Sequence, residues 1–145
     1  MGVSNTVREM PESTRSAAEA AAALGCDVAQ IVKSLIFRSV ADDEALLVMV
    51  SGADRVDESR LAGVVGGEVE RASGRFVRDR TGYAIGGVPP ICHTNAVTTY
   101  LDEHLLDHGV VWAAAGTPRA VFSVTPDDLV RITSAKVVAV SGAGD

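Results

Sequence analysis

Hydrophobic and polar residues follow two different periods along this chain, and the change from one to the other predicts a mixture of strands and short helices. The run at 45–51 is apolar almost throughout, as in a strand covered on both faces, and it is expected to pair with 31–40 as an antiparallel hairpin. Further strands are predicted at 68–73, at the start of 97–109, and at 110–116, 120–124 and 135–140.

Capping residues mark the predicted helices. Ser13 or Thr14 precedes an alanine-rich segment that ends at Gly25. Asp57, Ser73 and Thr125 stand where N-caps are expected, and Pro126 occupies a first helical position. Helices are therefore predicted at 13–25, 57–67, 73–82 and 125–133, with one more helical turn before Gly109.

These elements predict an α/β fold with a mixed sheet. Strands and helices do not alternate one for one, which argues against a doubly wound parallel sheet. We expect a curved mixed β-sheet of about six or seven strands surrounded by short helices. The 145 residues are expected to form one domain, 1–145, with 1–11 as a loose lead-in.

Composition narrows the classes of function. The net charge is −6, which argues against a broad nucleic-acid surface, so any RNA contact is expected to be local. No apolar run approaches the roughly 18 residues of a membrane span, and the N-terminus has no secretory apolar core, so no membrane association and a cytoplasmic location are expected. Cys26 and Cys92 are expected to be reduced thiols.

Lys33 stands out because the run around it, 31–37, is otherwise mostly apolar. Lysine is rarely buried unless it is paired or functional, so it is a candidate for a cleft. The alternative is an outward-facing lysine on a half-exposed strand.

Two loops are candidates for substrate contact. In 82–90, Gly86 and Gly87 allow close approach of the backbone and the following prolines stiffen it, which suits N–H groups that hold a carbonyl oxygen; a tight turn is the alternative. In 113–118, a buried strand ends in Gly-Thr-Pro, which indicates either a pocket floor or a hairpin turn.

The sequence shows no motif for metal binding or for a serine nucleophile. The three histidines, His93, His104 and His108, form no metal-ligand pattern, and no serine lies in a nucleophile elbow, so neither a metal nor a cofactor is expected. Arg71, Arg75 and Arg78 would share one face if this segment were helical, which makes them candidates for phosphate contact or simply a solvated face.

The ordered segments AAEAAAALG, QIVKSLIF, TGYAIGGVPP, AAAGTP and FSVTPDDLVRIT together resemble the YbaK family, over roughly residues 12 to 140. This family includes the editing domain inserted in bacterial prolyl-tRNA synthetases. The resemblance implies a partly barrel-like sheet and hydrolysis of the aminoacyl ester of mischarged tRNA. The chain carries no synthetase catalytic or anticodon domain, so action in trans is expected.

The resemblance also implies roles for individual residues. Lys33 matches the family's lysine at the pocket, Gly86, Gly87 and Pro89 match its glycine-proline loop, and Gly116 matches the glycine of the pocket floor. Lys33, Gly86 and Gly87 are therefore expected to be catalytic. Substrate contacts are expected from Ser34, Val88, Pro89, Gly116 and Thr117. Some relatives carry a histidine or an acidic residue after the glycine that Gly116 matches, whereas this chain continues Thr-Pro-Arg-Ala-Val.

The expected partner is the acceptor end of tRNA, with tRNA-Pro carrying alanine or cysteine as the expected substrate, and a prolyl-tRNA synthetase is a candidate partner. The chain is expected to be a monomer or homodimer. Two alternatives stay open: an inactive binding module of the same fold, and a hydrolase for a small ester or amide unrelated to tRNA.

Overall fold

The computed structural model describes residues 7–9, 17–82, 97–114 and 120–143. The helices in this part are α1 (Ala17–Leu24), α2 (Glu58–Val65), α3 (Gly74–Thr81) and α4 (Pro126–Thr133), with 3-10 helices η1 (Val28–Gln30) and η2 (Glu103–Asp107). The strands are β1 (Val7–Glu9), β2 (Val32–Ser39), β3 (Glu44–Ser51), β4 (Asp54–Val56), β5 (Val69–Arg71), β6 (Thr98–Asp102), β7 (Val111–Ala114), β8 (Ala120–Val124), β9 (Lys136–Val138) and β10 (Ser141–Ala143).

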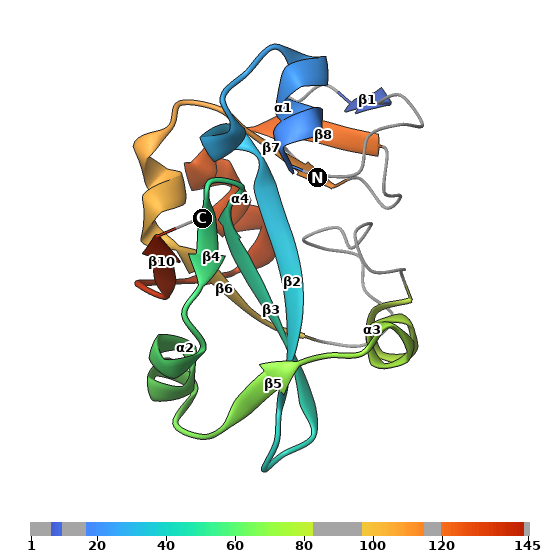
Figure 1. Cartoon of the computed structure of the whole chain (residues 1–145), viewed down its shortest axis with the longest axis vertical. Coiled ribbons are helices and arrows are strands. Elements are labelled where there is room, and N and C mark those ends of the chain that lie inside the picture. The colour runs from blue at the N-terminus through green and yellow to red at the C-terminus, as the bar shows by residue number, and fades with distance from the viewer. Residues whose placement is uncertain (1–6, 10–16, 83–96, 115–119, 144–145) are drawn as a thin grey trace.

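A five-stranded mixed sheet organises the molecule, in the order β5-β2-β3-β6-β9. β2 and β3 run along the long axis of the molecule (Figure 1). They form the predicted antiparallel hairpin, with Lys33 opposite Val50. β6 joins β3 in parallel, and β9 joins β6 in parallel. Every residue of β3 after Glu44 is buried, as expected for a strand covered on both faces.

The two faces of this sheet build separate cores, because successive side chains of a strand point to opposite faces. Val32 and Ile36 pack on one face with α3, η2, β7, β8 and α4, whereas Phe37 packs on the other with α2, Val69 and Val140. Figure 1 shows α3 on one side of β2, and β4 and β10 on the other. These two sides are called the α3 face and the β10 face.

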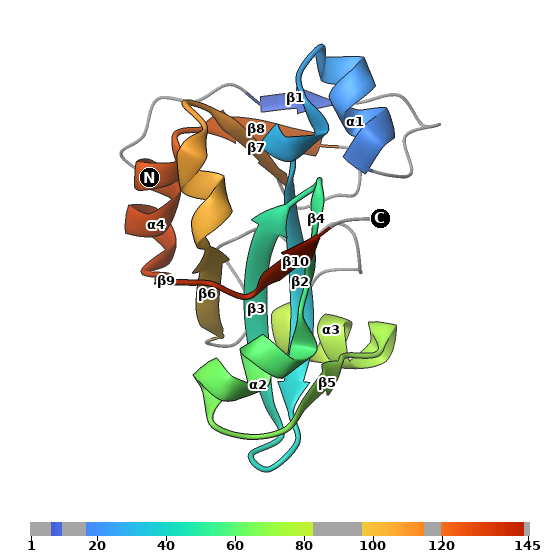
Figure 2. The ribbon, with the colours of Figure 1, turned by 60° about the vertical axis from the view of Figure 1, so that its left-hand side comes forward.

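Two smaller sheets complete the strand arrangement. β1, β8 and β7 form an antiparallel sheet, and β10 pairs with β4 in front of β3 (Figure 2). A single bridge from Ile31 to Trp112 links the start of β2 to β7. The mixed α/β class is confirmed, but these sheets are not closed, so the barrel-like closure is not seen in the described residues.

Helix boundaries follow the predicted caps. The side chains of Asp57, Ser73 and Thr125 accept hydrogen bonds from backbone N–H groups in the first turns of α2, α3 and α4. Gly66 and Gly82 end α2 and α3 in the left-handed conformation, at φ of 86° and 84°. No helix in the described ranges is long and apolar enough to cross a membrane.

The described residues contain more strands than the sequence predicts. β4 and β10 are three-residue strands that were not expected, and β1 lies within the expected lead-in. β4 and β10 position the polar cluster described below.

Candidate functional site

Two of the predicted segments lie outside the described residues. They contain the expected catalytic glycines Gly86 and Gly87 and the expected substrate contacts Val88, Pro89, Gly116 and Thr117. Of the predicted site residues, the structure therefore places Lys33, Ser34 and the three arginines.

Lys33 lies on β2 with its side chain partly buried, and its Nζ donates a hydrogen bond to the backbone carbonyl of Asp54. It shares the β10 face with Leu35 and Phe37. Burial lowers the pKa of Lys33; the carboxylate of Asp54 opposes this shift, and the charges of Arg55 and Arg71 add to it. The ammonium therefore has charged neighbours of both signs, and the carboxylate of Asp54 acts on it more strongly than either arginine.

Ser34 lies on the opposite face. Its Oγ is buried and has no hydrogen-bond partner in the described part of the chain. It shares the α3 face with Val32 and Ile36, both members of the core there. A buried hydroxyl without a partner costs free energy, so a polar substrate group on this face would satisfy it.

Lys33 and Ser34 were both predicted to lie at the substrate, yet the pleat of β2 directs them to opposite faces. One pocket confined to a single face of β2 therefore cannot be lined by both side chains. A substrate could contact both Lys33 and Ser34 only if it extended around the end of β2 from one face to the other.

The three arginines do not share a helix face, so that interpretation of the sequence is wrong. Arg71 ends β5, opposite Phe37 of β2, and its guanidinium lies 5.5 Å from the centroid of that ring. Arg75 and Arg78 lie on α3, which begins only at Gly74. Arg71 therefore belongs to the β10 face with Lys33, and the other two belong to α3.

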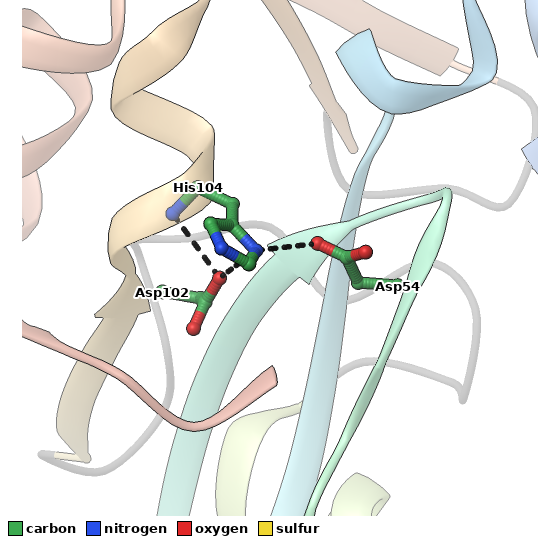
Figure 3. A group of neighbouring side chains, drawn as sticks. All are labelled: Asp54, Asp102 and His104. Carbon is green, nitrogen blue, oxygen red and sulfur yellow. Dashed lines mark hydrogen bonds and ion pairs between the residues drawn. The ribbon is translucent and has the colours of Figure 1, made fainter. Parts of the chain in front are cut away.

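Sequence reasoning missed a polar cluster at the edge of the β10 face. Figure 3 shows the ring of His104 between the carboxylates of Asp54 and Asp102, its Nδ1 lying 3.1 Å and 3.5 Å from their Oδ2 atoms. The Oγ of Ser141 lies 2.9 Å from the same nitrogen. The members come from β4, β6, η2 and β10, so no local motif could have revealed them.

Asp102 anchors this cluster. Its fully buried carboxylate accepts hydrogen bonds from the backbone N–H groups of His104, Val140 and Ser141. These bonds cap η2 and attach the chain before β10 to the end of β6. Three N–H donors compensate the free-energy cost of burying this carboxylate, so Asp102 has a structural role in holding these segments together.

The neighbours of His104 determine where its proton lies. Two carboxylate oxygens face Nδ1, and in the charged ring this nitrogen donates its proton to Asp54, the nearer carboxylate. The hydrogen bond to Asp54 and the charge of Asp102 raise the pKa of His104. The ring is 56% exposed.

Asp54, Asp102 and His104 each offer a ligand atom, and the three atoms lie within 4.8 Å of one another, so a metal ion could be held here. The same Nδ1 also lies within hydrogen-bonding distance of the Asp54 carboxylate, at 3.1 Å, and of the Ser141 Oγ, at 2.9 Å. Hydrogen bonds and an ion pair account for the cluster without an ion.

Known proteins are similar to this chain over most of its length. The chain is 29% identical to the uncharacterized protein YwhH of Bacillus subtilis (strain 168) over 92% of this chain and 84% of that protein. It is 33% identical to a proline–tRNA ligase of Limosilactobacillus fermentum, over 68% of this chain and 18% of the ligase.

One solved structure superimposes with a TM-score of 0.91 and 47% identity, over 96% of this chain and 87% of the other. It is described as "Crystal structure of a putative trans-editing enzyme for prolyl tRNA synthetase". The family model for the aminoacyl-tRNA editing domain matches residues 11–132, and the chain therefore belongs to the aminoacyl-tRNA editing domain family.

Proposed function

We propose that this protein is a trans-editing deacylase that hydrolyses the aminoacyl ester of mischarged tRNA, and that its substrate is tRNA-Pro carrying a small non-cognate amino acid such as alanine or cysteine. The observation that carries the proposal is the match of residues 11–132 to the editing-domain family. The likeness to part of a proline–tRNA ligase supports the choice of tRNA.

Hydrolysis of an aminoacyl ester does not require a strong nucleophile from a protein side chain. An aminoacyl ester is already activated, so a positioned water or ribose hydroxyl, with donors on the carbonyl oxygen, suffices for hydrolysis. We propose that the backbone N–H groups around Gly86 and Gly87 supply those donors. The editing step is useful because a synthetase discriminates a small apolar difference only about 10–200-fold.

Lys33 supplies the charge in this proposal. Its ammonium is partly buried, its described acceptor is the uncharged carbonyl of Asp54, and its charged neighbours are the Asp54 carboxylate and the guanidinium groups of Arg55 and Arg71. A carbonyl does not neutralise the ammonium, so its positive charge can act on a phosphate of the acceptor end or on negative charge that develops during ester cleavage.

A panel of mischarged tRNAs tests the proposal. Purified protein is incubated with tRNA-Pro charged with alanine, cysteine or proline, and amino-acid release is measured. Release of alanine or cysteine but not proline is expected. Binding of these tRNAs without release would instead identify an inactive binding module.

Competition by uncharged tRNA distinguishes the proposed deacylase from a hydrolase of small esters. Uncharged tRNA-Pro should inhibit the deacylation, because it occupies the same acceptor-end site. Hydrolysis of small amino-acid esters that is insensitive to uncharged tRNA would identify a small-molecule hydrolase instead.

A further inference from the structure

The hydrogen bond from Lys33 ends on a short strand that is weakly supported by itself. Asp54 opens β4, a three-residue strand paired with β10 in a two-stranded sheet. The pairing spans only three residues on each strand, and Val56 at the far end of β4 is the residue that packs against the core. The position of the Asp54 carbonyl, and with it that of the Lys33 Nζ, therefore depends on further attachments of Asp54.

His104 provides such an attachment. Its Nδ1 donates to the Asp54 carboxylate at 3.1 Å, across 50 positions of sequence. The imidazole is itself held from two sides, because its backbone N–H binds Asp102 and its Nδ1 contacts the Oγ of Ser141. Figure 3 shows the contacts from Asp102 at the buried end of β6 through His104 to Asp54. The hydrogen bond from Lys33 to the Asp54 carbonyl continues this path to β2.

The contact between His104 and Asp54 also determines whether the Asp54 carboxylate pairs with Lys33. A carboxylate that is not engaged by His104 would attract the nearby ammonium of Lys33 and draw it from the carbonyl into a direct ion pair. A lysine paired in this way is neutralised and displaced from a substrate anion. His104 therefore keeps the Asp54 carboxylate occupied while the Asp54 carbonyl orients Lys33.

We propose that His104 and Asp54 are positioning residues for Lys33, with His104 holding the Asp54 carboxylate so that the Asp54 carbonyl aims the ammonium at the substrate. This inference rests on the proposed function for its effect on catalysis, but not for its effect on Lys33 itself. The charged groups around Lys33 are Asp54, Arg55 and Arg71, and those around His104 are Asp54, Asp102 and Glu103.

The chain allows a direct measurement because it has only two lysines, Lys33 and Lys136. Protein labelled with isotopes in lysine alone gives two side-chain NMR signals, which Lys136→Arg assigns. Lys136 is exposed on β9 and serves as the internal reference. Titration of the signals reports the pKa of Lys33 without reference to activity.

Two variants are expected to shift this pKa in opposite directions. Asp54→Asn removes the carboxylate that favours the ammonium, so the pKa of Lys33 should fall. His104→Ala leaves that carboxylate without its donor, so the pKa of Lys33 should rise. His104→Asn keeps a side-chain N–H near the position of Nδ1 and should restore most of the wild-type value, and His108→Ala is the matched histidine control.

Deacylation gives the second readout. Asp54→Asn and His104→Ala should each lower kcat by about 10-fold to 100-fold with a smaller change in KM, because a misplaced catalytic group affects the reaction more than binding. Shifts of the Lys33 pKa in the same direction in both variants, or no shift, would overturn the inference. A wild-type protein that releases no amino acid, but shows the opposite shifts, would overturn the proposed function and leave the positioning of Lys33 supported.

Discussion

The side chain of Lys33 combines partial burial, an uncharged hydrogen-bond acceptor and charged neighbours of both signs, Asp54 with Arg55 and Arg71. Lys33→Ala removes this charge without creating a large cavity, because the aliphatic stem leaves a space open to solvent. We expect deacylation to fall at least about tenfold, which corresponds to about 1.4 kcal/mol of barrier, with thermal unfolding little changed. Lys136→Ala removes the other lysine and should retain normal turnover; normal turnover in Lys33→Ala would remove Lys33 from the mechanism.

Ser34 and Ser51 lie on the neighbouring strands β2 and β3; Ser51 is a buried residue, whereas Ser34 is half-buried with a buried Oγ. The Oγ of Ser51 donates to the carbonyl of Ala29 and accepts from Ala53, whereas that of Ser34 has no partner in the described residues. Ser51→Ala should therefore lower the free energy of unfolding by about 1–2 kcal/mol, and Ser34→Ala should leave it unchanged or raise it. Denaturant unfolding measures both.

The same variant tests the predicted contact of Ser34 with substrate. If the hydroxyl binds the aminoacyl group, Ser34→Ala raises KM for mischarged tRNA while the protein stays as stable as wild type. An unchanged KM would show that the serine has no part in binding.

Gly52 is required by close packing rather than by its backbone conformation. A Cβ there would lie 2.6 Å from the carbonyl oxygen of Val28 and 2.9 Å from the Cβ of Ala17. Gly52→Ala should destabilise the protein by about 1–3 kcal/mol, since backbone must move to relieve the contact. Gly63, inside α2, has open space around it, so Gly63→Ala should stabilise by about 0.5–1 kcal/mol. Equal changes in the free energy of unfolding for Gly52→Ala and Gly63→Ala, measured with denaturant, would contradict this prediction.

Elements with strong local signals were predictable from the sequence. The caps of α2, α3 and α4 and the β2–β3 hairpin follow from short patterns of capping residues and apolar runs, and the structure confirms them. β4 and β10 were missed because three residues are too few to show a period, and each exists only by pairing with the other. The cluster around His104 was missed because its members come from four elements, of which only β6 and η2 are neighbours in the sequence.

The arginine segment shows a different limit. Spacing at i, i+4 and i+7 suggests one helix face, but Arg71 belongs to a strand that ends before α3 begins. The same sequence also predicts a strand at 68–73 and the Ser73 cap. Because β5 pairs with β2, its register carries the guanidinium to Phe37, which no local pattern could indicate.

The ion pair between β4 and η2 should make stability depend on pH. The pKa of His104 is raised above its ordinary value of 6.5, so the charged ring is favoured in the folded state. This stabilisation is fully present below about pH 6.5 and is lost as pH rises through the raised folded pKa. His104→Asn keeps a donor but cannot titrate, which isolates the contribution of the charge.

The measurement is denaturant unfolding of wild type and His104→Asn from about pH 5 to about pH 9, a range that begins below the ordinary histidine pKa and extends well above it. The free-energy difference in favour of wild type should be largest at the low end and should shrink as pH rises. A difference that grows with pH would mean that the ring is neutral in the folded state and would contradict the ion pair.

Across the whole molecule, the central sheet separates charged groups into two regions. Lys33, Arg71 and the cluster of Asp54, Asp102 and His104 lie on the β10 face, whereas α3 with Arg75 and Arg78 packs on the α3 face. A chain with net charge −6 repels tRNA on average, so binding needs local positive charge. α3 offers two exposed arginines on one short helix, next to a segment that belongs to the predicted substrate loop.

The salt dependence of tRNA binding tests whether α3 is that region. Each lysine or arginine that neutralises a phosphate adds about one unit to the slope of log affinity against log salt. Arg75→Glu with Arg78→Glu should therefore weaken binding and flatten the slope by about two units, if both contact phosphate. Arg131→Glu with Lys136→Glu changes the net charge equally at exposed positions on α4 and β9, and should leave the slope nearly unchanged because long-range repulsion is screened within about 10 Å at 0.1 M salt. Equal slopes in wild type and the α3 variant would identify these arginines as a solvated face and direct the search for the tRNA contact to the Lys33 side, where Arg71→Glu is the corresponding variant.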